Sequence, residues 1–366
     1  MKIHEKFMKT CLKLALKGLN KTQTNPLVGC VIVHKGKIIS KGYHKKYGDH
    51  HAEVNAIKKI KNTNILAEST LYVNLEPCSH YGKTPPCVDL IIKSKIKNIV
   101  IGTKDPFKKV NGKGYKKLQK KTNIITGVLA SECIKINKQY FINHYFKRPL
   151  IILKWAQSKD GFVNNFKTGK IKISCEDSHI LTHKWRSEVD GIMVGTKTIL
   201  CDNPKLTTRK FKGKNPIRIT IDRDNIIKGK KWHILNNEAK TIIINTTKNK
   251  VQNNIEYLKI QKTIKSKKLN DKEILVSIVK KLYKKGIKSI LIEGGPIILQ
   301  NYIDINLWDE IRYFKCSKLL NQGIKAPIIS LKSDKNMKTG SDNLNIIYNK
   351  ETHTKLEQTF YENALI

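Results

Sequence analysis

The sequence predicts an α/β protein made of two domains. Its 366 residues exceed the roughly 100–200 residues that are typical of one domain. Short apolar runs of strand length alternate with helical patterns along the chain, and a hydrophobic content of 39% is enough to build cores. The succession of elements begins afresh around residue 147, so we expect one domain over residues 1–146 and another over residues 147–366.

The first domain begins with an amphipathic helix, because apolar residues recur at spacings of three and four over residues 7–19. Asn25-Pro26 ends this pattern. The order of the elements that follow, strand, strand, helix, strand, helix and strand, implies a layered α/β domain. We expect strands over residues 28–33, from residue 38 on, over 70–74 and over 98–102, with helices over 52–60 and 85–94.

The second domain has apolar runs of strand length with helical patterns between several of them, which predicts a largely parallel sheet. The clearest helix covers residues 274–282. The strand candidates are residues 149–155, 191–195, 217–221, 241–245 and 289–292.

Composition argues against membranes and against disulfide scaffolds. No apolar run approaches the roughly 20 residues of a membrane span, and residues 1–10 lack the apolar core of a signal peptide. We therefore expect a cytoplasmic protein with reduced thiols and no membrane partner. The eight cysteines are thinly spread, and only Cys78 and Cys87 have a suggestive local context.

The formal net charge of +42 raises the question of a nucleic-acid partner. However, the lysines are spread over the whole length and alternate with Ile and Asn, as in residues 58–62 and 93–98. All three residue types have AT-rich codons, so mutational drift can produce this pattern. We favour drift over a nucleic-acid surface, and either interpretation is compatible with a small anionic substrate.

Three residues form a candidate zinc site. His51 lies at the start of a predicted helix, Cys78 follows a strand, and Cys87 begins the next helix. One nitrogen and two sulfurs leave the fourth tetrahedral position open for water, as in catalytic zinc sites. Zinc lowers the pKa of that water to about 7, and Glu53 is placed to carry a proton from it to a ring nitrogen and the leaving amine. Each residue alone suits a surface or core role, but together they predict a zinc-dependent hydrolytic deaminase.

The spacing of the cysteines narrows this prediction. Zinc base deaminases carry H-x-E followed by P-C-x-x-C, whereas eight residues separate the two cysteines here. The string Glu76-Pro-Cys-Ser-His-Tyr-Gly-Lys-Thr-Pro-Pro-Cys87, with Asn25-Pro-Leu-Val-Gly29 and His51-Ala-Glu-Val54, resembles the bifunctional riboflavin-biosynthesis deaminase/reductase family of bacteria. Among cytidine-deaminase-like enzymes, the long loop between the cysteines is specific to that family.

The resemblance implies a cytidine-deaminase-like three-layer fold for the first domain. It further implies that zinc hydroxide hydrolyses 2,5-diamino-6-(5-phosphoribosylamino)pyrimidin-4-one at C2, with Glu53 as proton shuttle. The pyrimidine and the ribose phosphate would be held by Asn25, His44, Lys83 and Thr84.

The second half gives weaker signals by itself. The turn Glu293-Gly-Gly-Pro296 follows an apolar strand and suits a phosphate, although an ordinary tight turn explains it as well. Asp202-Asn-Pro204 is likewise compatible with a plain turn. The family resemblance nevertheless continues to about residue 320, through Lys154-Trp-Ala-Gln-Ser-Lys-Asp-Gly161, Gly195-Thr-Lys-Thr-Ile-Leu-Cys-Asp-Asn-Pro-Lys-Leu-Thr-Thr-Arg209 and Ile292-Glu-Gly-Gly-Pro296.

This continuation implies a dihydrofolate-reductase-like α/β domain. NADPH would deliver hydride to C1′ of the ring-opened imine form of the ribosyl group, giving a ribityl product. Asp202 is expected to serve both the cofactor and catalysis. The other residues expected along NADPH are Ala156, Thr198, Gly295, Pro296, Ile297, Ile298, Leu299, Gln300 and Asn301. Those expected at the substrate are Arg186, Leu206, Arg209 and Glu293, with the planar arginine forks on its phosphate.

Two departures from the family pattern concern the cofactor. The family usually has a Gly-Glu-Ser-Gln-Trp-Ile-Thr-like stretch, whereas this chain reads Gly169-Lys-Ile-Lys-Ile-Ser174. Lys172 falls about where the tryptophan would be, and Arg223 replaces a usual serine. We expect these two basic side chains to meet the 2′-phosphate of NADPH, the alternative being a weakened reductase.

The sequence leaves two alternatives. A tRNA or nucleoside deaminase with a degenerate or non-reductase second domain shares the zinc chemistry, but the long loop and the reductase-like half argue against it. The second alternative is a nucleic-acid-binding protein with a structural zinc site. Three ligands rather than four, and the presence of Glu53 beside them, argue against it. We therefore expect a homo-oligomeric enzyme that acts on a small phosphorylated pyrimidine, with nucleic acid not a partner.

Overall fold

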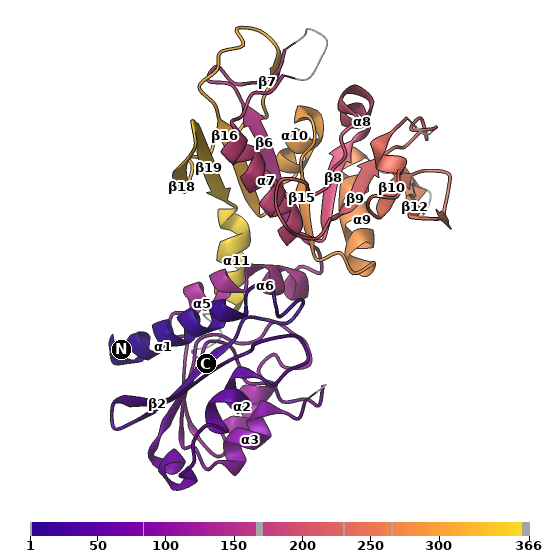
Figure 1. Ribbon diagram of the computed structural model, residues 1–366. Helices are drawn as coiled ribbons and strands as arrows, with labels where there is room; N and C mark the ends of the chain where they lie inside the picture. Colours follow the sequence, from indigo (N-terminus) through magenta and orange to yellow (C-terminus); the bar gives the residue numbers. More distant parts are fainter. Residues whose placement is uncertain are drawn as a thin grey trace. The chain divides into compact units, whose positions relative to one another are not determined.

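The computed structural model describes residues 2–82, 84–165, 171–229, 231–261, 263–264, 267–268 and 270–360. The chain forms two compact units (Figure 1), one of Met1–Lys147 with Glu351–Ile366 and one of Arg148–Lys350. Both are mixed α/β, which confirms the predicted fold class. Among the described helices, none combines the length and the apolar character that crossing a membrane requires.

The first unit is built on a five-stranded sheet with the order β2-β1-β3-β4-β5. β1 pairs antiparallel with both β2 and β3, and β3, β4 and β5 are parallel. Between β1 and β2, Lys35 and Gly36 have positive φ angles of 46° and 74°, as a tight hairpin turn requires. The strands are β1 (Gly29–His34), β2 (Lys37–Tyr43), β3 (Thr70–Val73), β4 (Asn98–Ile101) and β5 (Asn123–Thr126).

Helices cover both faces of this sheet, because successive strand side chains point to opposite sides. Ile32 and Leu71 pack toward α2 and α3, while Val31 and Tyr72 pack toward α1 and α5. The result is the three-layer arrangement visible in Figure 1. The helices of the unit are α1 (Lys2–Ala15), η1 (Leu16–Gly18), α2 (Ala52–Ile57), η2 (Thr63–Glu68), α3 (Cys87–Lys93), α4 (Lys113–Leu118), α5 (Ala130–Ile136), α6 (Lys138–Tyr145) and α11 (Lys350–Phe360).

The C-terminal helix changes the expected domain division. We expected residues 147–366 to stay together, but Glu351–Ile366 belongs to the first unit. Phe360 is buried and its ring lies 5.2 Å from that of Phe141 and 5.7 Å from that of Tyr145, measured between centroids. These aromatic contacts with α6 explain the difference, since burying an aromatic ring is strongly stabilising.

The second unit is built on a ten-stranded sheet with the order β11-β12-β10-β9-β8-β15-β6-β16-β19-β18. Pairing is parallel from β12 through β16 and antiparallel at both edges. The strands are β6 (Leu150–Gln157), β8 (Gly191–Gly195), β9 (Ile217–Ile221), β10 (Thr241–Asn245), β11 (Lys250–Gln252), β12 (Ile255–Lys259), β15 (Ser289–Ile292), β16 (Glu310–Lys315), β18 (Lys335–Thr339) and β19 (Asp342–Tyr348). The short pairs are β7 (Phe162–Asn164) with β17 (Ile324–Lys325), and β13 (Thr263–Ile264) with β14 (Lys267–Lys268).

Both faces of the parallel region are covered, which is why its strands read as continuous apolar runs. Ile151 and Leu153 face the cluster formed with α9 and α10, whereas Ile152 faces the cluster that includes Trp185 of α7. The helices are α7 (Glu176–Glu188), α8 (Thr196–Asp202), η3 (His233–Leu235), α9 (Asp271–Lys284) and α10 (Pro296–Asp304).

A close approach at Gly42 brings α2 onto the first sheet. A Cβ atom at Gly42 would lie 2.2 Å from the Ala52 carbonyl oxygen and 2.5 Å from the Ala56 nitrogen. Glycine is therefore required for α2 to lie directly on β2. Since His51 and Glu53 belong to the start of this helix, the contact also sets their depth above the sheet.

Gly42→Ala is expected to push α2 outward. Overpacking of this kind costs about 1–3 kcal/mol of stability and should also lower zinc content through His51. Denaturant unfolding and metal analysis of the purified protein measure both effects. Gly195→Ala is the control, because its new Cβ would have no neighbour closer than 4.0 Å. Unchanged stability and zinc content in Gly42→Ala would contradict the role given to this contact.

Candidate active sites

The three predicted metal ligands come together at one edge of the first sheet. β1 is antiparallel to both β2 and β3, so β2 and β3 run in the same direction and end at the same edge. His51 follows β2 as the N-cap of α2, Cys78 follows β3, and Cys87 is the first residue of α3. Consecutive strands and helices thus deliver ligands that are far apart in sequence to one place.

Their spacing fits a tetrahedral metal ion. His51 Nδ1 lies 3.5 Å from Cys78 Sγ and 3.4 Å from Cys87 Sγ. Zinc–ligand bonds of 2.0–2.3 Å at tetrahedral angles separate nitrogen and sulfur ligands by roughly 3.6 Å. Among the described residues, this is the one group of three or more His, Cys, Asp or Glu whose ligand atoms all lie within 4.8 Å of one another. Three ligands leave one tetrahedral corner for a reactant.

Hydrogen bonds distinguish the two sulfurs. Cys78 Sγ accepts the Cys87 backbone N–H at 3.3 Å. The hydrogen bond from the Cys87 thiol and the bond with His51 lower the pKa of Cys78, and the bond with Cys78 raises the pKa of Cys87. A divalent cation would favour the thiolate of both.

Glu53 lies beside the ligands without joining them. Glu53 is 3% exposed, and its Oε2 has no hydrogen-bond partner in the described part of the chain. Burial raises the pKa of its carboxyl group. Leaving a buried carboxylate oxygen unsatisfied is costly, and this fits a group that accepts and returns a proton during a reaction.

His44 and Asn25 are also brought to this edge. The His44 ring lies edge-on to the His51 ring, with centroids 5.4 Å apart. Its Nδ1–H donates to the His50 carbonyl at 3.2 Å, and its Nε2 accepts from Asn25 Nδ2 at 3.1 Å. Burial lowers the pKa of His44, so these two bonds hold a neutral imidazole in one tautomer.

The loop between the two cysteines carried two further expected residues. Thr84 is half-buried, and its carbonyl accepts the Gly82 N–H at 3.3 Å. Lys83 lies outside the described residues. The contribution of this loop to phosphate binding therefore stays a prediction.

Two acidic residues for which the sequence predicted no role, Glu76 and Asp105, hold the segments around the metal ligands together. The Glu76 carboxylate accepts the backbone N–H groups of Asp105, Gly112 and Tyr115 at 2.9–3.1 Å. Asp105 accepts the Tyr140 hydroxyl at 3.0 Å, and burial raises its pKa to about 7. Glu76 belongs to the Glu-Pro-Cys motif, but only the fold shows that its carboxylate accepts hydrogen bonds from three backbone N–H groups that are distant in sequence.

In the second unit, Glu293 and Arg186 form an ion pair whose side chains are 10% and 13% exposed. Glu293 directly follows β15, and its two carboxylate oxygens accept from Arg186 Nε and Nη2 at 2.8 and 2.9 Å. Lys154 Nζ lies 3.9 Å from the same carboxylate. Burial alone would raise the pKa of Glu293, but Arg186 and Lys154 lower it to about 2. The carboxylate therefore stays ionised and holds the guanidinium in a fixed, bidentate geometry.

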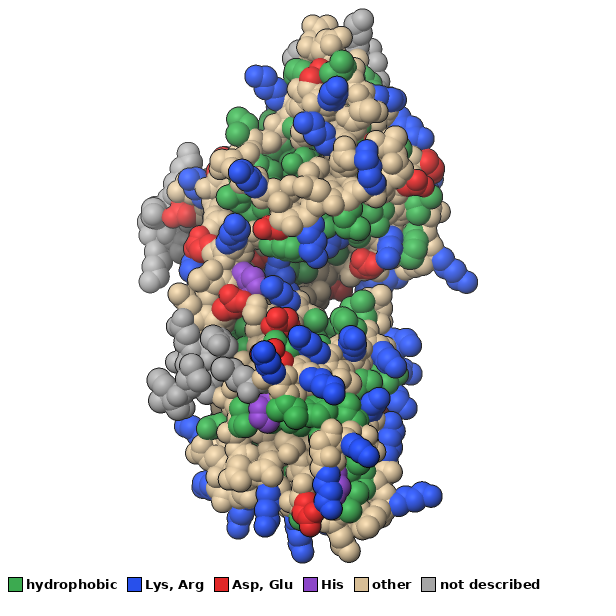
Figure 2. Space-filling model, turned by 90° about the vertical axis from the view of Figure 1, so that its left-hand side faces the viewer, with side chains coloured by type: hydrophobic (Ala, Val, Ile, Leu, Met, Phe, Trp, Pro, Cys, Tyr) green, Lys and Arg blue, Asp and Glu red, His purple; other side chains and the backbone are tan. Residues whose placement is uncertain are grey.

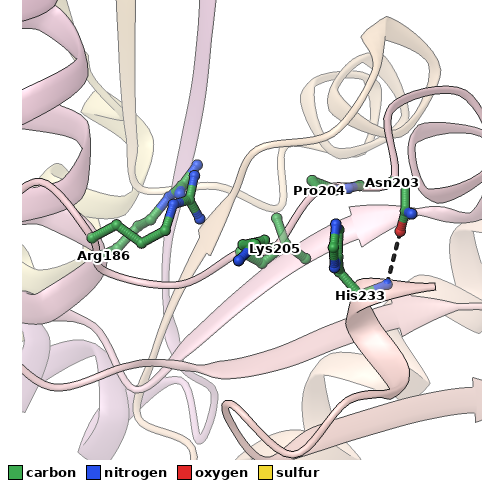
Figure 3. Close-up of a pocket in the computed structure, with 7 residues that line it drawn as sticks. Arg186, Asn203, Pro204, Lys205 and His233 are labelled. Atoms are coloured by element: carbon green, nitrogen blue, oxygen red, sulfur yellow. Dashed lines mark hydrogen bonds between the residues drawn. The ribbon is translucent and has the colours of Figure 1, made fainter. Parts of the chain in front are cut away.

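A pocket of about 340 Å³ opens beside this pair, and Figure 3 shows several of its side chains. Arg209 also faces it, with Nη1 donating to Thr207 Oγ1 at 3.1 Å and no ion pair among the described residues. Three of the four expected substrate residues thus share one pocket, with Glu293 behind Arg186. The lining residues are Arg186, Asn203, Pro204, Lys205, Leu206, Arg209 and His233.

The residues expected along a dinucleotide follow the carboxyl ends of adjacent parallel strands, where ligands of such sheets bind. Thr198 Oγ1 accepts the Gly295 N–H at 3.1 Å, joining α8 to the turn after β15. Gly295 is the N-cap of α10 and Pro296 is in its first turn, so the N-cap residue has no side chain of its own to cap this end. A helix N-terminus in this position fits a phosphate group. Ala156 is half-buried near the end of β6, and Asp202 ends α8.

Some of the expected cofactor side chains have other partners. Ile298 and Leu299 are 9% and 0% exposed and pack in the core, so they can offer a ligand little beyond backbone atoms. Gln300 bonds to Asp304 and to the Ile328 N–H, and Ile297 and Asn301 are exposed. These residues lie in a helix, so their side chains point in different directions around its axis, and only some of them can face the sheet edge.

The two basic residues expected at the 2′-phosphate lie on the surface. Arg223 follows β9 and pairs with exposed Asp271 at 2.8 Å. Lys172 is paired with Glu176 at 3.2 Å, one turn along, and its side chain is 62% exposed. Residues 169 and 170 of the altered segment lie outside the described residues.

Both halves of the chain match known protein families. Residues 1–103 match the cytidine and deoxycytidylate deaminase zinc-binding region, and residues 149–343 match the RibD C-terminal domain. The riboflavin biosynthesis protein RibD of Aquifex aeolicus is 35% identical over 90% of this chain and 92% of its own. That of Buchnera aphidicola is 37% identical over 90% and 91%, and that of Escherichia coli 31% over 86% and 88%.

A solved structure matches over nearly the whole length. The diaminohydroxyphosphoribosylaminopyrimidine deaminase/5-amino-6-(5-phosphoribosylamino)uracil reductase of Thermotoga maritima superposes with a TM-score of 0.78 at 32% identity. The match covers 95% of this chain and 99% of that one. Both units therefore have counterparts within a single relative.

Cys87→Ser is expected to abolish stoichiometric zinc binding, because two ligands hold the ion far more weakly than three. Atomic emission on the purified protein measures zinc per chain. Cys201→Ser is the matched control, since Cys201 is an exposed free cysteine outside the cluster. Full zinc content in Cys87→Ser would remove that residue from the ligand set.

Proposed function

This chain belongs to the RibD family, and from that premise we propose which of its residues perform each of the family's two reactions. The chain is a bifunctional enzyme of riboflavin biosynthesis, with a zinc-dependent deaminase domain followed by an NADPH-dependent reductase domain. The observation that carries the assignment of residues is the convergence of His51, Cys78 and Cys87 beside the unpartnered Glu53 oxygen.

In the first reaction, water replaces the C2 amino group of 2,5-diamino-6-(5-phosphoribosylamino)pyrimidin-4-one, and ammonia leaves. His51, Cys78 and Cys87 would hold a zinc ion, which would supply the Lewis acidity that activates the water. The Glu53 carboxylate is placed to accept one proton from the attacking water and pass it to the ring nitrogen, and then to carry the second proton of that water, from the new hydroxyl group, to the leaving amine. Its buried, unsatisfied Oε2 supports this role, because no protein donor among the described residues occupies the oxygen that would accept the proton.

His44 and Asn25 position the pyrimidine. The imidazole of His44 is held neutral in one tautomer, so it does not compete with Glu53 as a proton carrier. The Asn25 amide nitrogen is engaged by His44, which directs its carbonyl oxygen toward an amino group of the ring. Lys83 and Thr84 remain our proposal for the ribose phosphate.

In the second reaction, a bound NADPH would supply the hydride that reduces C1′ of the ring-opened imine of the deaminated product. Arg186, fixed by Glu293, and Arg209 hold the substrate phosphate in the pocket beside Leu206. The N-terminus of α10 and Thr198 receive the cofactor at the carboxyl edge of the sheet. The catalytic role of Asp202 is supported by its place at the end of α8, directly before the pocket wall of Asn203 and Leu206.

Partners and setting follow from the surface and the cysteines. Figure 2 shows lysine and arginine side chains scattered over the face in view rather than gathered on one patch, which favours a small-molecule substrate over nucleic acid. All eight cysteines are free, which supports a reducing, cytoplasmic setting. The homo-oligomeric state stays a prediction.

Glu53→Gln should retain zinc but slow ammonia release by about 10²–10⁴-fold, because the amide cannot carry the proton. The assay supplies the diaminopyrimidine phosphate and follows ammonia. Reduction of the chemically prepared deaminated substrate is the internal control and should stay at the wild-type rate. Near-normal ammonia release would rule out the role of Glu53.

Arg209→Met should raise the KM of the reductase for its phosphorylated substrate by roughly 10- to 100-fold, since a hydrogen bond to a charged group contributes about 1.5–3 kcal/mol. NADPH oxidation with the deaminated substrate measures it. Lys210→Met is the matched control, because Lys210 is an exposed neighbour paired with Glu176. Equal KM values for the two variants would place the phosphate elsewhere.

A further inference from the structure

His233 lines the arginine pocket although nothing in its sequence context indicated a role. It belongs to η3, far from the pocket residues in sequence, and its ring faces the pocket together with Lys205 (Figure 3). Neither ring nitrogen has a hydrogen-bond partner among the described residues. Both nitrogens are thus available to a ligand.

The backbone of His233 is held unusually firmly by Arg218. The guanidinium of Arg218 is 0% exposed and uses all five of its N–H donors within the fold. Nη1 donates to the His233 carbonyl at 2.8 Å, and Nη2 donates to the carbonyls of Asn236 and Ala239 at 2.6 Å. Burying a guanidinium without a carboxylate is costly, so the position of this segment is strongly constrained.

A second contact joins the segment to Asn203, the residue that follows α8. Asn203 Oδ1 accepts the His233 backbone N–H at 2.8 Å, and its Nδ2 donates to the Lys231 carbonyl at 2.8 Å. Asn203 adopts the left-handed conformation, with φ 40° and ψ 56°. His233 is therefore fastened on both sides, with its ring left free of protein partners.

The charges of the pocket leave room for a further donor. Glu293 pairs with Arg186, and Glu238 pairs with Lys205 at 3.3 Å. Arg209 is the one lining Lys or Arg without an ion pair in the described part of the chain. A phosphate monoester carries about −1.5 to −2 charges and three acceptor oxygens, more than a single unpaired arginine satisfies. A histidine facing the site is suited to supply the missing donor.

We propose that His233 is a phosphate-binding residue of the reductase, with Arg218 as the residue that positions it. Its imidazole donates a hydrogen bond to a phosphate oxygen that Arg186 and Arg209 hold from the other side. The proposal rests on the proposed function, since it takes the pocket as the phosphate site. It makes His233 a determinant of the preference for the phosphorylated substrate over the free riboside.

The test compares 5-amino-6-(5-phosphoribosylamino)uracil with its dephosphorylated riboside in steady-state NADPH oxidation by the full-length, zinc-loaded enzyme. His233→Ala should raise KM for the phosphorylated substrate by about 10- to 100-fold and leave kcat nearly unchanged, as expected for uniform binding. KM for the riboside should not change. His233→Lys should restore much of the affinity, because it restores a donor.

Lys231→Ala is the matched control. It removes a surface cation two residues away, whose ammonium lies 4.8 Å from the centre of the Trp232 ring, and should leave both KM values unchanged. A wild-type KM in His233→Ala, or an equal increase for both substrates, would overturn the proposal. A wild-type enzyme that does not distinguish the phosphorylated substrate from the riboside would instead overturn the pocket assignment beneath it.

Discussion

The common direction of β2 and β3 is the constraint on which the deaminase site depends. Because β1 pairs antiparallel with both, the segments that follow β2 and β3 emerge at one edge, and two helices begin there. Because Gly42 has no side chain, the backbone of α2 lies directly against the sheet at this position. The strand arrangement alone brings the three metal ligands close enough to bind one ion, although they are far apart in the sequence. The second unit uses the same principle, with its ligand-facing residues after the ends of parallel strands.

The two active sites treat their buried carboxylates in opposite ways. Glu293 is compensated by Arg186 and Lys154 and keeps its charge at a pKa of about 2, so it serves as a fixed anchor. Glu53 has a buried oxygen without a partner, and burial raises its pKa. A carboxylate held by two cations orients a neighbour, whereas a carboxylate whose pKa is raised by burial is suited to exchange a proton. We therefore propose that the same residue type acts as a support in one unit and as a proton carrier in the other.

Much of this arrangement could be predicted from sequence, because the central strands are buried on both faces and read as continuous apolar runs. Exposed edge strands such as β11 lack that signal, and the predicted first helix ran too far, since α1 ends at Ala15 and Leu19 is 55% exposed. The zinc ligands were identifiable because their chemistry depends on residue type and spacing. Three features could not be identified from the sequence, because each depends on contacts between segments that are distant in sequence. They are the packing of α11 on the first unit, the hydrogen bonds of Glu76 and the position of His233.

One measurement tests the central claim most directly, namely that a single chain performs both reactions. The purified, zinc-loaded protein is given 2,5-diamino-6-(5-phosphoribosylamino)pyrimidin-4-one and NADPH, and ammonia and NADPH are followed together. The account predicts that ammonia release precedes NADPH oxidation and that both reach the same final amount. Ammonia release without NADPH oxidation would contradict the account of the second unit, and NADPH oxidation without ammonia would contradict that of the first.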